Sequence, residues 1–306
     1  MRHPGTNRRL PTMDLIKSLK RRGGIATWAQ LVAVGTATEV RAAVRDGRIE
    51  KVGHNRYALP STKKGRRAAA ALHGVVSHRS AAQHWSWGLK VMPPKVEVTV
   101  GRGRNIAEAQ RLQYAVHWAP LGPDDVEGVW TSPLRTVLDC ARSLPFDEAL
   151  CVVDSALRSG QDHDELRAAA ARLRGPGAIQ ARAVIAWGDG RAENPFESVL
   201  RLHALRAGLE VVPQKTIAGL GRPDLVDQGR RLILEADSWT WHEKTPVRHT
   251  RDCERYNAFV IAGWLVLWFT YAHVMTKGDY VEDVLRRFVD LSQRRPLPPI
   301  LTDPAA

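Results

Sequence analysis

The chain has 306 residues, of which 44% are hydrophobic and 25% charged, and its formal net charge is +13. This composition is ordinary for a globular protein, and the length is sufficient for two or three domains. The sequence has no apolar run of about eighteen residues, and the opening MRHPGTNRRLPTMD has no apolar core, so we expect neither a membrane-spanning helix nor a secretory signal.

The three cysteines, Cys140, Cys151 and Cys253, lie far apart and form no Cys-x-x-Cys spacing. This pattern argues against a disulfide framework and against a structural zinc site. It is typical of a reducing compartment, so we expect a cytoplasmic protein with no membrane partner.

The basic charge is concentrated near the N-terminus. Residues 1–67 contain 16 of the 45 Lys and Arg residues but only 4 of the 32 Asp and Glu residues. A basic module attached to a nearly neutral remainder favours a polyanionic partner. A soluble basic tail is the alternative, but the segment also shows a folding pattern, so we expect DNA as the partner.

This basic region has the pattern of three short helices and a hairpin. Apolar residues recur at helical spacing from Met13, Thr27 is a candidate N-cap, and Gly47 ends the third helix. The expected elements are helices from Met13 to Gly23, at 28–33 and at 38–45, and a β-hairpin at 48–59. Their order predicts a winged helix-turn-helix over residues 13–60, after a disordered basic tail at 1–12.

Basic side chains follow the third helix and the hairpin. We expect Arg41 and Arg45 to point outward from the helix, and Lys51 and Arg56 to lie on or beside the wing. Arginine can bond guanine through two donors or hold phosphate, so the role of each residue stays open. The next residues, 61–67 (STKKGRR), are predicted to be a basic linker.

Residues 68–186 predict an α/β middle domain. We expect a helix after Ser77 or Ser80, strands at 96–103 and 112–120, and amphipathic helices at 131–142 and 146–160. Three histidines, His78, His84 and His117, form no motif and are predicted to pack in the core or lie on the surface. The glycine-rich stretch up to residue 192 is predicted to be a hinge.

A second α/β pattern covers residues 190–292. Asn194 is a candidate N-cap, Pro195 takes the first helical position, and Gly208 follows the last turn. A strand carrying Gln214 comes next. The other expected elements are strands at 222–227, 231–237 and 264–270 and helices at 247–263 and 279–293. This order predicts a mixed sheet flanked by helices, and α/β is the expected fold class of the chain.

Acidic side chains lie on the hairpin predicted at 222–237. Glu235 and Asp237 share one face of their strand, and cross-strand pairing can bring Asp224 near that face. Neighbouring carboxylates repel one another unless a cation joins them, and Mg²⁺ prefers oxygen ligands. His242 follows and could position water or protonate a leaving group. The alternative is that Asp224 caps a turn and that Glu235 or Asp237 pairs with a nearby arginine, namely Arg222, Arg230 or Arg231.

The last domain, about residues 190–290, resembles the PD-(D/E)xK nuclease superfamily. Within it, the domain is most similar to the branch of very-short-patch mismatch repair endonucleases and their actinobacterial relatives of unknown function. The likeness is carried by Glu197, Gln214, RPDLV with Asp224, ILEAD with Glu235 and Asp237, Trp241-His242, RHTRDCERYN and GWLVLWFT. Two positions depart from the pattern: Asp237 stands where the superfamily has lysine, and Ser238 stands where the relatives carry glycine.

The resemblance implies a restriction-endonuclease-like fold and phosphodiester hydrolysis with Mg²⁺, or with Mn²⁺ in its place. Asp224 and Glu235 would be metal ligands, and Glu197 an outer ligand or a partner of the base. Asp237 and His242 would orient or protonate groups at the reacting phosphate. Phosphate or DNA contacts are implied for Gln214, Arg251 and Arg255.

The first 160 residues resemble AbiEi-type antitoxins of type IV toxin–antitoxin systems, which join an N-terminal winged helix to an α/β domain. The likeness lies in the runs SHRSAA, TSPLRTVLD and ALCVVDSALRSG. It implies promoter binding and a cognate toxin as partner. Two functions compete: a DNA-binding, Mg²⁺-dependent endonuclease, and an antitoxin-like transcriptional regulator with an inactive nuclease-fold domain. RNA processing is a third interpretation.

Overall fold

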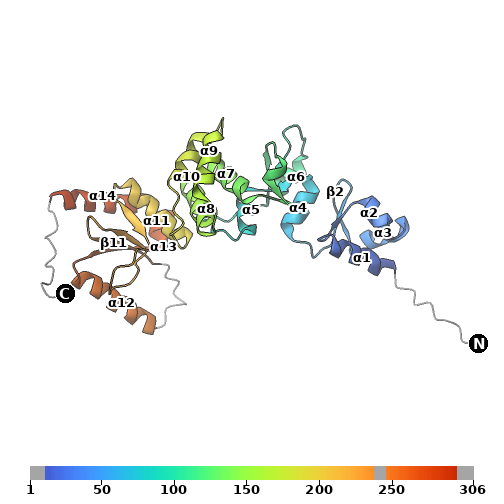
Figure 1. Ribbon diagram of the computed structural model, residues 1–306. Coiled ribbons are helices and arrows are strands. Elements are labelled where there is room, and N and C mark those ends of the chain that lie inside the picture. Colours follow the sequence, from blue (N-terminus) through green and yellow to red (C-terminus); the bar gives the residue numbers. More distant parts are fainter. Residues whose placement is uncertain (1–10, 238–245, 295–306) are drawn as a thin grey trace, which may run out of the picture. The chain divides into compact units, whose positions relative to one another are not determined.

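The computed structural model describes residues 11–237 and 246–294. The chain forms two compact units: unit 1 is Met1–Trp85 with Met92–Thr136, and unit 2 is Ser86–Val91 with Val137–Ala306. Helices and β-sheets occur in both units (Figure 1), so the expected α/β class is confirmed. None of the described helices combines the length and the apolar character that a membrane crossing needs.

Unit 1 begins with three helices and a small antiparallel sheet. The helices are α1 (Pro11–Arg21), α2 (Trp28–Val32) and α3 (Ala37–Arg45), and the strands are β1 (Ile25–Ala26), β2 (Glu50–Gly53) and β3 (Arg56–Ala58), in the order β1-β3-β2. Capping boxes start α2 at Thr27 and α3 at Thr36. The predicted helices and hairpin are confirmed. The expected tail is too long, because α1 already begins at Pro11; residues 1–10 lie outside the described part.

The predicted linker at 61–67 is wrong, because α4 (Lys64–Leu72) begins inside it. The residues from Ala68 to Leu72 are buried, so packing of this segment stabilises the helix. The basic residues of its first turn made the segment look like a linker in the sequence. Gly65 allows close packing at this point: a Cβ there would lie 2.5 Å from Cη2 of Trp130.

A five-stranded sheet completes unit 1. Its strands are β4 (Val75–Val76), β5 (Glu97–Val100), β6 (Ala115–Trp118), β7 (Val126–Glu127) and β8 (Trp130–Thr131), in the order β6-β5-β4-β8-β7. The helices are α5 (His78–His84), which starts after Ser77 as expected, α6 (Glu108–Gln113) and a 3-10 turn at Pro123–Asp125. The strand expected at 112–120 is shorter, since α6 takes its first residues.

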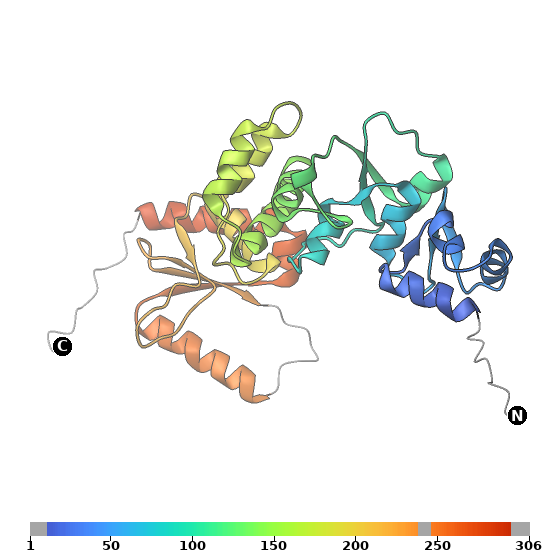
Figure 2. The same ribbon diagram turned by 45° about the vertical axis from the view of Figure 1, so that its right-hand side comes forward.

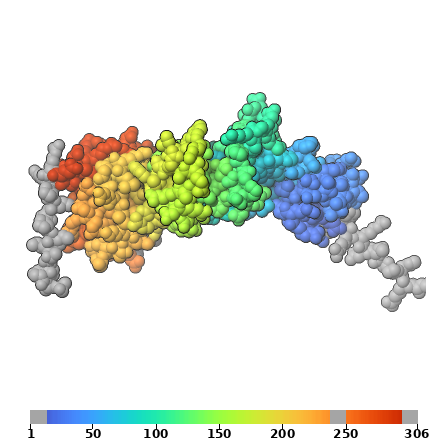
Figure 3. Space-filling model, turned by 45° about the horizontal axis from the view of Figure 1, so that its top comes forward, coloured from blue at the N-terminus to red at the C-terminus, as the bar shows by residue number. Residues whose placement is uncertain are grey.

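Unit 2 starts with a helical layer. Its helices are α7 (Pro133–Ser143), which begins at the end of unit 1, α8 (Phe146–Arg158), α9 (His163–Arg172) and α10 (Ala178–Ala186). Figure 3 shows the yellow-green segment with α9 and α10 at the surface. The stretch predicted as a hinge packs against α8, because a Cβ at Gly188 would lie 2.6 Å from Val153. The compact units therefore divide the predicted middle domain, 68–186, between them.

The rest of unit 2 is a four-stranded mixed sheet between helices. The strands are β9 (Val211–Pro213), β10 (Leu225–Asp227), β11 (Leu232–Asp237) and β12 (Leu265–Thr270), in the order β12-β11-β10-β9. Only β11 and β12 pair in parallel. The helices are α11 (Pro195–Arg206), α12 (Pro246–Ile261), α13 (Tyr271–Thr276) and α14 (Gly278–Arg294). The predicted mixed sheet is confirmed.

Alternate residues of the central strands feed two cores. Leu225, Leu232 and Leu234 pack with α11, α13 and α14, whereas Val226 and Ile233 pack with Phe259 of α12. Figure 2 shows α12 and α14 on opposite sides of the sheet. The cysteines are also placed: Cys140 and Cys151 are buried, and Cys253 is exposed on α12.

The β10–β11 hairpin sets the register of the acidic residues. Leu225 lies opposite Leu234, and Asp227 lies opposite Leu232. Asp224 precedes β10 by one residue and therefore faces Glu235 across the pair. The predicted hairpin and its turn are confirmed.

Candidate functional site

Asp224 is held at the start of β10 by two neighbouring segments. Its Oδ2 accepts a hydrogen bond of 2.7 Å from the amide of Ala236 on β11. Its backbone carbonyl accepts one of 2.9 Å from the amide of Gln214. Burial raises the pKa of this carboxyl. Strand β11 therefore holds the carboxylate, and the residue after β9 holds the backbone, of Asp224 at the end of the hairpin.

Gln214 links Asp224 to a second carboxylate. Its Nε2 lies 3.0 Å from Oε2 of Glu197 and 3.4 Å from Oδ1 of Asp224. The residue has φ +54°, in the left-handed region that a side chain other than glycine seldom adopts. An unfavourable backbone conformation thus places one amide between two acids.

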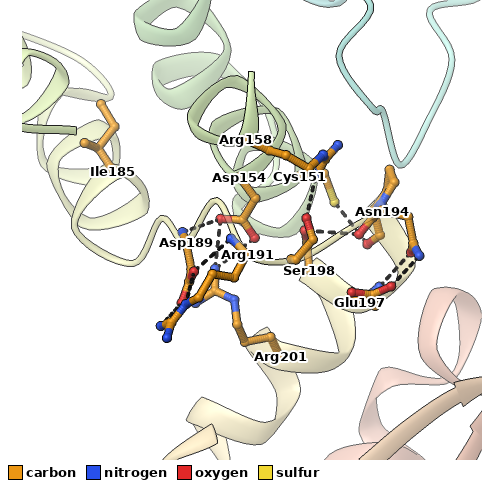
Figure 4. Close-up of polar contacts among 12 residues, drawn as sticks. Cys151, Asp154, Arg158, Ile185, Asp189, Arg191, Asn194, Glu197, Ser198 and Arg201 are labelled. Carbon is orange, nitrogen blue, oxygen red and sulfur yellow. Dashed lines mark hydrogen bonds and ion pairs between the residues drawn. The ribbon is translucent and has the colours of Figure 1, made fainter. Parts of the chain in front are cut away.

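Glu197 is buried in the first turn of α11 and is surrounded by donors. Asn194 caps the helix, because its Oδ1 accepts a hydrogen bond of 3.0 Å from the amide of Glu197. Its Nδ2 donates a hydrogen bond of 2.6 Å to Oε1 of Glu197 (Figure 4). The amide of Glu193 donates to Oε2 at 2.8 Å. Burial, helped by the charge of Asp224, raises the pKa of Glu197 to about 7.

Glu235 is the least satisfied acid of the group. The residue is 3% exposed on β11, and its Oε2 lies 3.1 Å from a guanidinium nitrogen of Arg255. Its Oε1 is buried and has no hydrogen-bond partner among the described residues. Burial and the charge of Asp224 raise the pKa to about 8, against the opposing charge of Arg255. Such an atom is costly unless a proton or a cation occupies it.

Arg255 approaches from α12. Its guanidinium carbon lies 5.5 Å from the ring centroid of Tyr256 and 5.9 Å from that of Phe259. Its Nε is buried without a partner in the described part of the chain. The arginine thus satisfies one oxygen of Glu235 and keeps a donor of its own unused.

The donor set suits a hard divalent cation in its chemistry. Asp224 and Glu235 offer carboxylate oxygens from adjacent strands, and one of these oxygens is buried and unpartnered. Within residues 11–237 and 246–294, however, no group of three His, Cys, Asp or Glu side chains could hold a metal ion. A cation here would therefore depend on few protein ligands, as Mg²⁺ sites commonly do.

Comparison with known proteins places the chain in a family. Two Mycobacterium tuberculosis sequences, "Uncharacterized protein MT2308" (strain CDC 1551 / Oshkosh) and "Uncharacterized protein Rv2248" (strain H37Rv), are 32% identical over 208 residues, 65% of this chain and 70% of theirs. The chain belongs to the family of these two proteins. No family model matches the sequence.

One solved structure shows a weak likeness to this member of the family. The crystal structure of the RV2827C protein from Mycobacterium tuberculosis aligns with a TM-score of 0.40 and 16% identity, covering 69% of this chain and 86% of that one.

The structure does not show the alternative pairing of Glu235 with Arg222, Arg230 or Arg231. Arg222 contacts Glu193, Arg230 contacts Asp227 at 2.9 Å, and Arg231 donates to the carbonyl of Ala262. The arginine that does reach the acids comes from α12, twenty residues after Glu235. Asn194 was expected only as a cap, although its spacing of three residues from Glu197 is that of a reciprocal capping pair.

Other predicted site residues fall in three groups. His242 and the side chain of Asp237 lie outside the described part. Arg251 is exposed on α12. The N-terminal residues lie on α3 and the hairpin: Arg41 sits 5.7 Å from the ring of Trp28, Arg45 pairs with Asp46 at 3.4 Å, Lys51 is exposed on β2 and Arg56 begins β3.

Proposed function

We propose that this chain is a DNA-binding protein whose C-terminal region hydrolyses phosphodiester bonds with Mg²⁺, or with Mn²⁺ in its place. One observation carries the proposal. A buried glutamate, Glu235, faces Asp224 across two paired strands, keeps Oε1 unpartnered and has a pKa raised to about 8. Buried acids with raised pKa values are enriched at functional sites.

Asp224 and Glu235 would hold the cation. When bound, Mg²⁺ would supply Lewis-acid stabilisation of the phosphate and lower the pKa of a water molecule. The side-chain amide of Gln214 donates to both Asp224 and Glu197. Glu197 has a pKa of about 7 and is therefore poised to exchange a proton near neutral pH. Glu235 would have to release its proton to bind the cation, so cation affinity should rise with pH.

Phosphate binding is assigned to α12. Arg251 and Arg255 lie one helical turn apart, which puts them on the same side of the helix. Arg251 is exposed and can meet a phosphate directly. Asp237 and His242 keep the roles expected from the resemblance.

DNA targeting is assigned to the basic N-terminal module, as a winged helix-turn-helix. Three helices with a three-stranded antiparallel sheet support this. In this arrangement α3 enters the major groove with Arg41 and Arg45, and the β2–β3 hairpin carries Lys51 and Arg56 along the backbone.

The test is cleavage of plasmid and mismatched duplex DNA by the full chain with Mg²⁺ or Mn²⁺. Variants Asp224→Asn and Glu235→Gln should lose at least about 100-fold in rate, because each removes an oxygen ligand or its charge. Asp290→Asn, at an exposed acid of α14, is the matched control and should cut as the wild type does. DNA binding should persist in all three.

A second function is favoured by one contact. The guanidinium of Arg255 places a positive charge 3.1 Å from Glu235, where an active site would hold the cation. An inactive nuclease fold could retain this ion pair for stability. The chain would then be an antitoxin-like regulator that binds promoter DNA and a cognate toxin. Intact DNA and RNA substrates after incubation with either metal, together with retained DNA binding, would establish this function instead.

A further inference from the structure

Unit 1 contains a cavity that the proposed nuclease site does not use. Its volume is about 430 Å³, within the range of small-molecule pockets. The lining comes from the start of α4, the end of α5, the residues before β5 and Trp130 of β8. All of these segments belong to the same compact unit.

Three lysines surround this cavity. Lys63 and Lys64 lie where α4 begins, and Lys95 lies just before β5. All three are exposed, and none has an ion-pair partner in the described part of the chain. By contrast, Lys90 pairs with Asp147. No side chain caps the first turn of α4, so its amide donors add to the lysine charges. The cavity is therefore suited to an anion.

The cavity also has a flat aromatic surface, which is formed by two of its lining residues. The rings of His84 and Trp130 stack with centroids 4.1 Å apart and planes 7° apart. Gly65 lies against Trp130 closely enough that a side chain would displace the ring. Burial, with the charges of Lys63 and Arg66, lowers the pKa of His84 and so favours the neutral form of the ring.

We propose that this cavity binds a nucleoside phosphate, with the lysines at the phosphate and the His84–Trp130 stack against the base. An inorganic anion would leave the rings unused, and an apolar ligand would leave three lysines unpaired. Aromatic stacking tolerates any base, because every base has a π-face. The ligand could be a free nucleotide or the phosphorylated end of a nucleic-acid strand, and this proposal is independent of the proposed nuclease.

The test measures binding of fluorescently labelled ATP and of a labelled single-stranded oligonucleotide with a 5′-phosphate to the full chain. The triple variant Lys63→Gln, Lys64→Gln, Lys95→Gln should weaken binding about tenfold, as expected for three exposed charge contacts. Lys277→Gln, at an exposed lysine of unit 2, is the matched control and should change nothing.

The ring contribution is separated by His84→Ala and His84→Phe. Alanine should weaken both probes several-fold and phenylalanine should restore binding, whereas the affinity for inorganic phosphate, measured by competition, should not change. Binding of ATP identifies a free nucleotide as the source, and binding of the oligonucleotide alone identifies a strand end. The proposal is overturned if neither probe responds to these substitutions, or if closed circular duplex responds equally to the loss of the ring.

Discussion

Asp154 and Glu235 are both buried carboxylates that contact an arginine, yet only Asp154 is completely paired. Arg201 contacts both oxygens of Asp154 at 2.9 Å, and the amide of Asp189 donates at 2.8 Å (Figure 4). Glu235 meets one nitrogen of Arg255 and leaves Oε1 without a partner among the described residues. The fully paired carboxylate of Asp154 holds two helices, α8 and α11, together, whereas the unpartnered oxygen of Glu235 retains the capacity to bind something else.

The largest expected effect is a difference in the free energy of unfolding between variants of the two acids. Asp154→Ala would leave Arg201 buried and unpaired, so we expect a loss of about 3–5 kcal/mol in the free energy of unfolding. Glu235→Gln should cost less than about 1 kcal/mol at pH 7, because this side chain, with a pKa of about 8, is already protonated. Urea unfolding of both variants measures these losses. Equal losses of unfolding free energy would contradict the distinction between a fully paired and a partly paired carboxylate.

The next effect concerns Mg²⁺. A cation that binds only the folded chain should stabilise it by about 2.7 kcal/mol at a hundred times its Kd. We expect this stabilisation for the wild type at pH 8 and not for Glu235→Gln, with EDTA as the reference. Thermal unfolding is the measurement. A Tm that does not respond to Mg²⁺ or Mn²⁺ in the wild type would favour the regulator.

Per pH unit, the change of stability with pH should be smaller, and its direction should be opposite to that of ordinary acids. The folded-state pKa of Glu235, about 8, lies above the usual 4.5, so the unfolded chain loses this proton first. The stability is then complete below about pH 4.5 and is lost as the pH rises to about 8, at up to about 1.4 kcal/mol per pH unit. Urea unfolding without metal should show this slope, and Glu235→Gln should flatten it.

The smallest effect lies at Asn194. Asn194→Ala should cost about 1 kcal/mol, as helix caps do. Asn194→Asp keeps the cap but removes the donor to Oε1 of Glu197 and adds a negative charge. We therefore expect near wild-type stability, with the pKa of Glu197 and the pH optimum of cleavage shifted upward. An unchanged optimum would mean that this donor does not act on the site.

Local patterns allowed much of the candidate site to be predicted. The alternation of apolar and polar residues around a turn predicted the hairpin with Asp224 and Glu235. The pair Asn194-Pro195 predicted the start of α11. Both features depend only on residues that are neighbours in the sequence. The start of α4 was missed, because a charged first turn hides a buried alanine run.

The pairings between distant segments could not be predicted. Asp154 and Arg201 are 47 residues apart in the sequence. Arg255 reaches Glu235 only because α12, which connects the parallel strands β11 and β12, packs on one face of the sheet. Neither contact leaves a periodic trace in the sequence, since each depends on how whole elements pack.

The cysteines have a practical consequence. Cys253 is exposed on α12, two residues before Arg255, while Cys140 and Cys151 are buried. A thiol-reactive fluorophore should therefore attach at one position in the native protein without any mutagenesis. Its emission would report changes in the surroundings of α12 when DNA is added, and would so test the proposed phosphate contacts of this helix.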